Sequence, residues 1–292
     1  MKIVFVILHY HAKEETIKSV ASIQEKTDVE EYKIVIVDNA SKDGSGEYLK
    51  KKYEADEHIT VLLNEQNLGF ARGNNVGFRY AKNTWDPDYI VLMNNDVYLL
   101  DDDTVSKIEQ EYQRSQFAVL GPMIYTVDGR CNINPIRLQP MTKAEVEKEI
   151  RIYSNKQKLY HYHLDTLRDF YRRIRPVKKK KSYKVFIERM EHVQLHGCFM
   201  VFSRKYTEKF DGLDDRTFLY REEAILYKHM CENSLNCVYL PDIHVFHRED
   251  ASTDTIVKTD RERVIFEISH HLKSLNVLKK VYESYEGSGG GK

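Results

Sequence analysis

Acidic and amide side chains follow two long apolar runs of this 292-residue chain. Asp38 comes directly after Ile34–Val37, and Asn94-Asn95-Asp96 comes after Tyr89–Met93. A carboxylate at the first position can accept hydrogen bonds from a ribose or from the N–H of a base. Asp96 suits a hard divalent cation, which takes oxygen ligands and often bridges a protein carboxylate to substrate phosphates. The alternatives are a turn cap formed by Asp38 and an Asn-rich turn ahead of Asp96.

A second pair of acids lies late in the chain, where Glu222 and Glu223 follow Phe218–Arg221. Adjacent residues do not share one face of a helix, so one carboxylate can point into a cleft while the other pairs elsewhere. A carboxylate whose pKa is raised toward the working pH can act as a general base. The alternative is a helix start with acids in its solvated first turn. His247 is likewise either a metal ligand or a structural histidine.

Glycine recurs every four residues at Gly69, Gly73 and Gly77, along one face of an expected helix. The missing Cβ lets another group approach closely, and that group is either a neighbouring backbone or a nucleotide. Arg72, in the same stretch, can pair with a diphosphate. The spacing matches neither the dinucleotide-binding fingerprint nor the P-loop. It therefore leaves helix packing and ligand contact as alternatives.

The hydrophobic pattern predicts a scaffold that brings these side chains together. Buried strands are predicted at 3–8, 33–37, 59–63 and 89–93, with helices at 14–26, 48–53, 69–82 and 104–112. Strands that alternate with helices indicate an α/β fold with a mainly parallel sheet flanked by helices. Ligands bind beyond the carboxyl ends of such strands, where all four runs end in polar residues. Asp101–Asp103 are expected to cap the helix at 104–112.

The later part of the chain follows a different pattern. Residues 140–192 are expected to form an inserted polar helical arm, which carries eight basic residues and no acid between Arg172 and Lys184. Strand character returns over 193–202, interrupted by His196-Gly197-Cys198, and 255–285 is expected to form an amphipathic helix. The Gly-rich residues 287–292 are expected to be a flexible tail.

Composition excludes several classes of protein. The chain has 45 basic and 45 acidic residues, and this balance argues against a general nucleic-acid binder. The apolar fraction of 41% excludes a disordered chain, and the charged fraction of 31% argues against an integral membrane protein. Four cysteines without a C-x-x-C pair indicate reduced thiols, so we expect a cytoplasmic protein.

The succession of motifs resembles family 2 glycosyltransferases of the GT-A fold, near the bacterial rhamnosyltransferase-like branch. The resemblance is carried by Val4–Tyr10, Val35–Gly44, Asn67–Asn75, Leu92–Asp96, Phe218–Glu223 and His247 with Ser252. It implies a single GT-A domain over 1–286. Residues 1–130 would form the nucleotide-sugar-binding half, 193–255 the acceptor and catalytic half, and 256–286 a C-terminal helical segment. The arm at 140–192 and the C-terminal segment lie outside the resemblance.

The resemblance also implies a role for each matching residue. The donor nucleotide would be held by Leu8, Tyr10, Asp38, Asn39, Asn67, Arg72, Asn75 and Asn95. Within that set, Asp38 would contact the uracil or thymine base and the ribose. Asp96, as the last acid of the family's D-x-D motif, and His247 would bind Mn²⁺ or Mg²⁺. Glu223 stands where the family has its catalytic base, with Glu222 beside it.

Several positions depart from the family pattern. The D-x-D motif retains one acid because it contains Asn94 and Asn95, and Glu223 replaces an Asp. Ile225 stands where a further Asp is usual, and His11 stands where the family often has Asn. These departures bear on metal dependence and on the geometry of the acceptor more than on the fold.

The implied activity is inverting transfer of a sugar from a UDP- or dTDP-linked donor to a hydroxyl of a glycan or lipid-linked acceptor, in surface polysaccharide synthesis. The stretch Arg172–Lys184 is either a solvated loop or a surface that meets anionic headgroups or a lipid-diphosphate-linked acceptor, which would place the protein peripherally on the inner face of the cell membrane. Two alternatives remain. A sugar nucleotidyltransferase would need a Gly-rich basic loop where His9–Lys13 stands, and a non-catalytic polysaccharide-binding protein would leave the acids unexplained.

Overall fold

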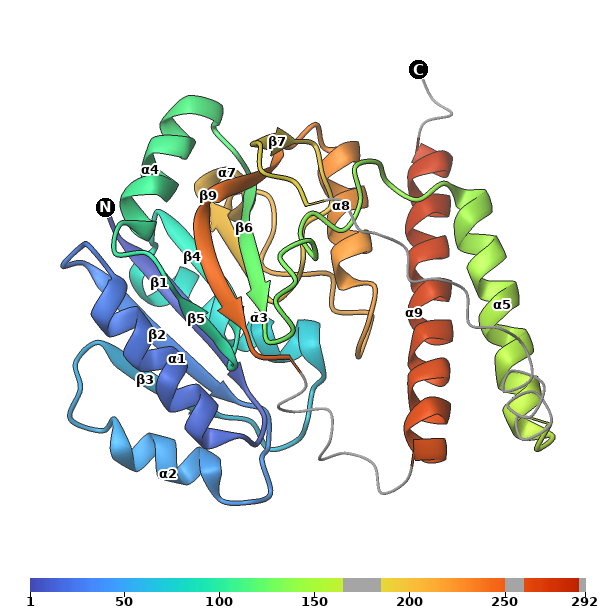
Figure 1. Ribbon diagram of the computed structural model, residues 1–292, viewed down its shortest axis with the longest axis horizontal. Coiled ribbons are helices and arrows are strands. Elements are labelled where there is room, and N and C mark those ends of the chain that lie inside the picture. The colour runs from blue at the N-terminus through green and yellow to red at the C-terminus, as the bar shows by residue number, and fades with distance from the viewer. Residues whose placement is uncertain (165–184, 250–259, 289–292) are drawn as a thin grey trace.

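The computed structural model of the protein describes residues 1–164, 185–249 and 260–288. Its centre is one sheet with the strand order β3-β2-β1-β4-β8-β6-β9-β5, and β7 pairs with β9 (Figure 1). The strands are β1 Ile3–His9, β2 Tyr32–Asp38, β3 Ile59–Leu63, β4 Tyr89–Asn94, β5 Val97–Leu99, β6 Val119–Thr126, β7 Met190–Glu191, β8 Phe199–Ser203 and β9 Cys237–His247. The first four are mutually parallel, and β8 runs antiparallel to both β4 and β6. The predicted α/β fold is confirmed.

Helices cover both faces of this sheet. They are α1 Lys13–Lys26, α2 Ser45–Lys52, α3 Phe70–Trp85, α4 Thr104–Ser115, α5 Lys143–His161, α7 Arg204–Thr207, α8 Glu222–Glu232 and α9 Asp260–Ser288. Alternate residues of a strand face opposite sides. In β1, Phe5 and Ile7 therefore join the core under α1, α2 and α4, whereas Val4 and Val6 join the core under α3 and α8.

The helices α5 and α9 stand side by side beyond α8 (Figure 1). Val146, Ile225 and Leu278, one from each of the three helices, meet in a small separate core. Ser274 Oγ of α9 also donates a hydrogen bond of 2.7 Å to the Leu219 carbonyl, just before α8. The C-terminal helix is thereby held against the segment that leads into Glu222 and Glu223.

The expectation about the start of α4 is wrong. None of Asp101–Asp103 makes a side-chain cap there, because Asp28 accepts hydrogen bonds from the Val105 and Ser106 amides at 3.1 and 3.2 Å. The interrupted strand expected over 193–202 has a bridge at Gln194, a break at 196–198 and then β8 from Phe199. The backbone of Gln194 bonds to Ile136 and Arg137 instead of extending β8, at 2.8 Å in both directions.

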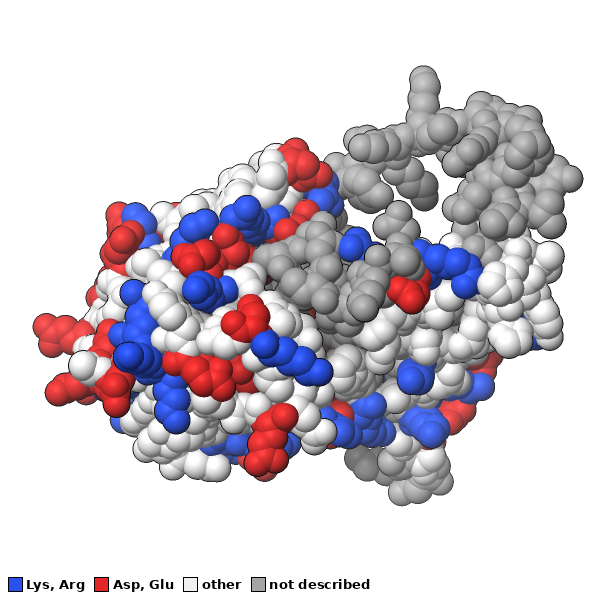
Figure 2. Space-filling view, turned by 90° about the horizontal axis from the view of Figure 1, so that it is seen from below, with Lys and Arg blue, Asp and Glu red and all other residues white. Residues whose placement is uncertain are grey.

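The remaining boundaries differ in smaller ways. The helix α9 runs through Gly287 to Ser288, so the expected tail begins later than predicted. The stretch Arg172–Lys184 of the expected arm lies outside the described residues, whereas α5 supplies the helix expected at the start of the arm. No described helix is both long and apolar enough to span a bilayer. Basic and acidic side chains are interspersed over the face in Figure 2.

Candidate active site

Two adjoining cavities open beyond the carboxyl ends of β1, β2 and β4. The first, of about 170 Å³, is lined by five of the predicted donor-binding residues, Leu8, Tyr10, Asn39, Asn67 and Asn95. The second, of about 310 Å³, is lined by both predicted catalytic residues, Glu222 and Glu223. Residues common to both linings, such as Asn94 and Tyr220, join the two cavities.

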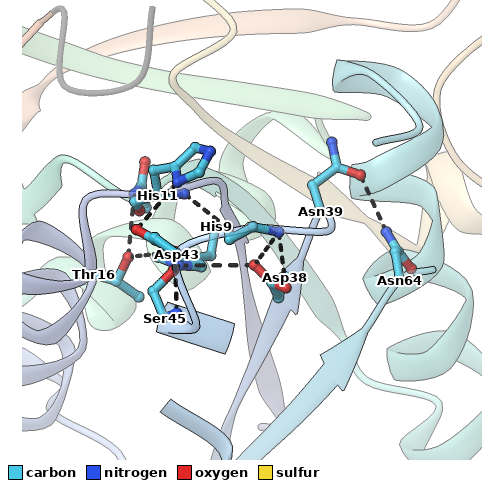
Figure 3. A network of polar contacts seen from close by, with 10 residues as sticks. His9, His11, Thr16, Asp38, Asn39, Asp43, Ser45 and Asn64 are labelled. Atoms are coloured by element: carbon cyan, nitrogen blue, oxygen red, sulfur yellow. Dashed lines mark hydrogen bonds and ion pairs between the residues drawn. The ribbon is translucent and has the colours of Figure 1, made fainter. Parts of the chain in front are cut away.

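Asn39, at the end of β2, holds the loop that forms one wall of the first cavity. Its Nδ2 donates to Asn67 Oδ1 at 3.0 Å and to the Gly69 carbonyl at 3.1 Å. Its Oδ1 accepts from the Leu68 amide at 3.0 Å and from Asn64 Nδ2 at 3.2 Å, the second of which is drawn in Figure 3. The nitrogen and the oxygen of the Asn39 side-chain amide therefore both hold this loop in position.

The glycine stripe is explained by packing. Gly69 has a φ of +80°, and a Cβ there would lie 2.3 Å from the Phe218 carbonyl, which accepts a 2.8 Å hydrogen bond from the Phe70 amide. A Cβ at Gly77 would lie 2.4 Å from Val6 Cγ1 in the sheet. The stripe thus allows α3 to pack closely on β1. At Gly69, the missing Cβ allows the backbone at Phe218, before α8, to contact the start of α3.

Asp38 belongs to a buried polar network behind the first cavity (Figure 3). It is 4% exposed, accepts hydrogen bonds from the Ser41 amide, and lies 3.8 Å from His9 Nε2. The two ring nitrogens of His9 bond to Thr16 Oγ1 at 2.7 Å and to Ser45 Oγ at 2.8 Å. Burial raises the pKa of Asp38 and lowers that of His9 to about 4, so His9 is neutral. The turn cap proposed for Asp38 is present, and its contact with the donor stays a prediction.

Two other predicted donor residues lie away from the cavities. Arg72 is exposed on α3, and its Nε donates to the Asp215 carbonyl at 2.9 Å. Asn75 is buried and exchanges two hydrogen bonds with the Leu213 backbone, at 2.8 and 2.7 Å. Neither residue lines either cavity. This geometry does not support the donor contacts predicted for Arg72 and Asn75. The two hydrogen bonds of Asn75 instead connect α3 to the loop that carries Leu213.

Asp96 and His247 do meet, as the resemblance implied. His247 Nε2 lies 3.3 Å from Asp96 Oδ1, and the two residues are 8% and 5% exposed. Burial lowers the pKa of His247, but Asp96 and the Cys198 thiol outweigh burial and raise it to about 10. Its Nδ1 has no hydrogen-bond partner among the described residues.

One carboxylate and one imidazole suit a divalent cation that takes its other ligands from a diphosphate and water, as Mg²⁺ commonly does. Within the described residues, no cluster of three or more His, Cys, Asp or Glu side chains is arranged to hold a metal. Asp96 and His247 would therefore hold such a cation only in partnership with the substrate.

The structure separates the two catalytic candidates at the start of α8. Glu222 is 5% exposed and accepts a 2.9 Å hydrogen bond from Thr217 Oγ1, and its burial, with the charge of Glu223, raises its pKa to about 8. The Glu223 carboxylate lies against Gly197, where an added Cβ would be 2.7 Å from Oε1. Glu222 is therefore mostly protonated at neutral pH, and the base role expected of the half-buried Glu223 stays a prediction. The sequence pattern had not singled out Thr217 or Gly197.

Comparison with protein families identifies the chain. It matches the model of glycosyl transferase family 2 over residues 4–210. The chain belongs to this family. It is similar to the "Uncharacterized glycosyltransferase YfnE" of Bacillus subtilis (strain 168), with 26% identity over 121 residues. That alignment covers 41% of this chain and 30% of the relative, so the chain matches less than a third of the relative's length.

Solved structures share the GT-A fold. TarS 1-349 of S. aureus in complex with UDP has a TM-score of 0.53 and 13% identity, over 94% of this chain and 65% of that chain. GalNAc-T7 with UDP, GalNAc and Mn²⁺ has a TM-score of 0.58 and 13% identity, over 98% and 50%. The mannosyltransferase PcManGT from Pyrobaculum calidifontis, in complex with GDP-Man and Mn²⁺, has a TM-score of 0.53 and 12% identity, over 100% and 76%. At these identities the likeness concerns the fold, which agrees with the predicted GT-A architecture.

Proposed function

We propose that this glycosyltransferase moves a sugar from a UDP- or dTDP-linked donor to an acceptor hydroxyl, with inversion at the anomeric carbon. One observation carries the proposal. The cavity lined by Leu8, Tyr10, Asn39 and Asn67 opens into the cavity that holds the Glu223 carboxylate. Family membership and the nucleotide-sugar complexes of the similar structures support a nucleotide-sugar donor.

The donor half of the site binds the nucleotide sugar and orients it. Leu8 and Tyr10 supply apolar surface for the nucleoside, and Asn67 supplies polar edges beside it. Asn95, buried just after β4, lines the same cavity and directly precedes Asp96 in the chain. A divalent cation held by Asp96 and His247 would neutralise charge on the departing diphosphate.

The catalytic half moves a proton. Glu223 takes the proton of the acceptor hydroxyl as that oxygen bonds to the anomeric carbon, while the bond from this carbon to the diphosphate breaks on the opposite face. This single displacement inverts the configuration. General-base catalysis contributes ~10²–10⁴ in rate. With its pKa raised to about 8, Glu222 is mostly protonated and uncharged near neutral pH, so it does not repel the carboxylate of Glu223.

The test is Glu223→Gln. Transfer is expected to fall by about 10²–10⁴, since the amide cannot accept the proton, while calorimetric affinity for the nucleotide stays unchanged. The matched control is Glu232→Gln at the exposed end of the same helix, which should keep full activity. Wild-type transfer by the Glu223 variant would reject Glu223 as the base.

The metal role is tested through Asp96→Asn. This variant keeps the shape of the side chain and removes its charge, so the affinity gained by adding Mn²⁺ to the donor-binding assay should disappear. Titrations with and without Mn²⁺ measure this gain in both proteins. A wild-type protein that binds the donor equally well in both buffers would contradict the metal site.

The wider role proposed is surface polysaccharide synthesis on a glycan or lipid-linked acceptor. The eight basic residues of Arg172–Lys184, outside the described residues, support a peripheral contact with an anionic membrane. Sedimentation with anionic liposomes should recover the wild type and lose a variant with Lys178–Lys181 changed to Gln. Equal recovery of the two proteins would reject the membrane contact. Family membership speaks against the nucleotidyltransferase and non-catalytic alternatives.

A further inference from the structure

The central sheet has an open edge at β3. This strand is the first in the strand order and pairs on one side with β2. Figure 1 shows β3 and α2 at the margin of the molecule, away from α8 and α9. His58 and Asn64, which flank β3, are hydrogen-bonded to β2 through their backbones, at 2.8 and 2.9 Å. Because the backbone groups of a strand point alternately to its two sides, those of Val61 and Leu63 point to the open side.

This edge lacks the features that usually prevent a sheet edge from pairing further. Edge strands are commonly protected by a lysine, a proline or a β-bulge. The sequence of β3 is Ile-Thr-Val-Leu-Leu, and its register with β2 contains no bulge. At the other end of the sheet, β5 has three residues, whereas β3 has five. The β3 edge is therefore the stronger template for another strand.

A groove of about 520 Å³ lies between β3 and α2. Ile59, Val61 and Leu63 line it from alternate positions of the strand, so their side chains share one face of the sheet. Leu63 is 37% exposed. The groove is also lined by four exposed charged residues, the acids Glu47 and Glu54 and the bases Lys50 and Lys51. These four residues form the rim of the groove, and their charges sum to zero.

We propose that the β3 edge binds a second copy of this chain, with the two β3 strands antiparallel about a twofold axis at Val61. Such an axis brings the same surface of both copies together. Val61 then faces its own counterpart and Ile59 faces Leu63, so the residues on the open side of each strand meet. A second copy can set each acid of the rim against a base, whereas a strongly acidic or basic peptide would meet like charge on half of it.

The proposed contact is separate from the candidate active site. None of the residues that line the groove lines either of the two cavities beyond β1, β2 and β4. The inference therefore goes beyond sugar transfer and does not depend on it.

The first experiment changes the charges of the rim. Sedimentation velocity of the full chain, over about a hundredfold range of concentration, measures a dimer that forms by mass action. Glu47→Lys with Glu54→Lys makes the rim wholly basic, and Lys50→Glu with Lys51→Glu makes it wholly acidic. Each double variant should raise the dimer dissociation constant by about tenfold or more, because like charges then face each other. An equal mixture of the two should dimerise at least as tightly as the wild type.

The rim variants are suited to this comparison because lysine and glutamate are both good helix formers, so α2 is retained. The matched control is Glu208→Lys with Glu232→Lys, which makes the same change of charge at exposed positions away from β3. This control should leave the dissociation constant unchanged. Thermal melting of every variant checks that it is folded.

The second experiment tests the register with Val61→Cys. Residues that exchange two hydrogen bonds across antiparallel strands have Cα atoms about 5.5 Å apart, which is within reach of a disulfide. Mild oxidation should therefore link two copies of this variant. Thr60→Cys is the matched control, since the register places it opposite Leu62 and away from its own counterpart. The wild type, oxidised in parallel, accounts for the native cysteines.

Three results of the first experiment would each overturn the proposal: a wild type that stays monomeric at every concentration, rim variants that dimerise as the wild type does, or a mixture that stays monomeric. Cross-linking of Thr60→Cys in place of Val61→Cys would overturn it as well. If one variant fails to fold, the other experiment still decides. None of these results bears on the proposed function.

Discussion

Gly197 gives the sharpest test of the catalytic assignment, since its missing side chain leaves room for the Glu223 carboxylate. A Cβ at this position would lie 2.7 Å from Oε1 and 3.3 Å from Cδ of Glu223. The backbone of Gly197 is not left-handed, so alanine itself fits there. Gly197→Ala therefore moves the end of a flexible side chain and leaves the backbone in place.

The size of the effect follows from these distances. Ordinary contact begins at 3.4 Å, so the Glu223 carboxylate must withdraw by about 0.7 Å. A misplacement of ~1 Å at a reacting group can cost about 10²-fold in rate. We therefore expect kcat to fall by about 10- to 100-fold. The affinity for the nucleotide and the melting temperature should change little, because neither depends on this carboxylate.

The assay is single-turnover transfer at saturating donor, with calorimetry on the same samples. A double-mutant cycle with Glu223→Asp sharpens it, because a side chain one methylene shorter clears the new Cβ. Gly197→Ala should then cost less in the Glu223→Asp background than in the wild type. An unchanged kcat, or an equal loss in a Glu223→Gln background, would refute the argument that Gly197 acts through this carboxylate.

Three further perturbations have distinct signatures. Gly46→Ala places a Cβ 2.4 Å from Asp38 Oδ2 and so displaces that carboxylate. We expect calorimetry to show about tenfold weaker nucleotide binding, with kcat retained at saturating donor. An unchanged affinity would leave Asp38 without a donor role. Gly77→Ala places a Cβ 2.4 Å from Val6 in the core. Urea titrations should show the free energy of unfolding lowered by ~1–3 kcal/mol, with normal activity per folded molecule. An unchanged free energy of unfolding would contradict the close packing of α3 on the sheet. The pKa of Glu222 rises from 4.5 to about 8 on folding, so the folded state holds a proton that the unfolded state releases. The contribution of the Glu222 proton to the free energy of unfolding is therefore fully present below about pH 4.5. Between about pH 4.5 and pH 8 this contribution falls by ~1.4 kcal/mol per pH unit, and above about pH 8 it no longer changes. Glu222→Gln should flatten that slope in urea unfolding at pH 6, 7 and 8, and an identical slope in both proteins would reject the buried, protonated carboxyl.

Local patterns determined much of the architecture. Continuous apolar runs such as Ile34–Val37 predict buried strands because a strand covered on both faces needs apolar side chains at every position. Polar residues directly after those runs placed Asn39, Asn67 and Asn95 at one edge of the sheet, and all three line the first cavity. These features depend on neighbours in the chain, so the sequence displays them.

Contacts between distant segments could not be predicted in this way. Asp28 rather than any of Asp101–Asp103 caps α4, because its carboxylate, on the loop after α1, accepts hydrogen bonds from the Val105 and Ser106 amides. The Gln194 backbone forms an isolated bridge with Arg137 ahead of β8. In both cases the residues that decide the structure are more than 50 positions apart in the chain.

The sequence by itself determined that this chain has a parallel α/β sheet with polar strand ends, and its motif succession indicated the family. Only the tertiary structure decided that the glycine stripe serves packing, that Glu222 is buried while Glu223 is half-buried, and that α9 supplies His271 to the lining of the same cavity. The physical reason is common to all three. Burial and hydrogen-bond satisfaction depend on which segments meet in space, and a pattern read along one segment holds no information about its partner.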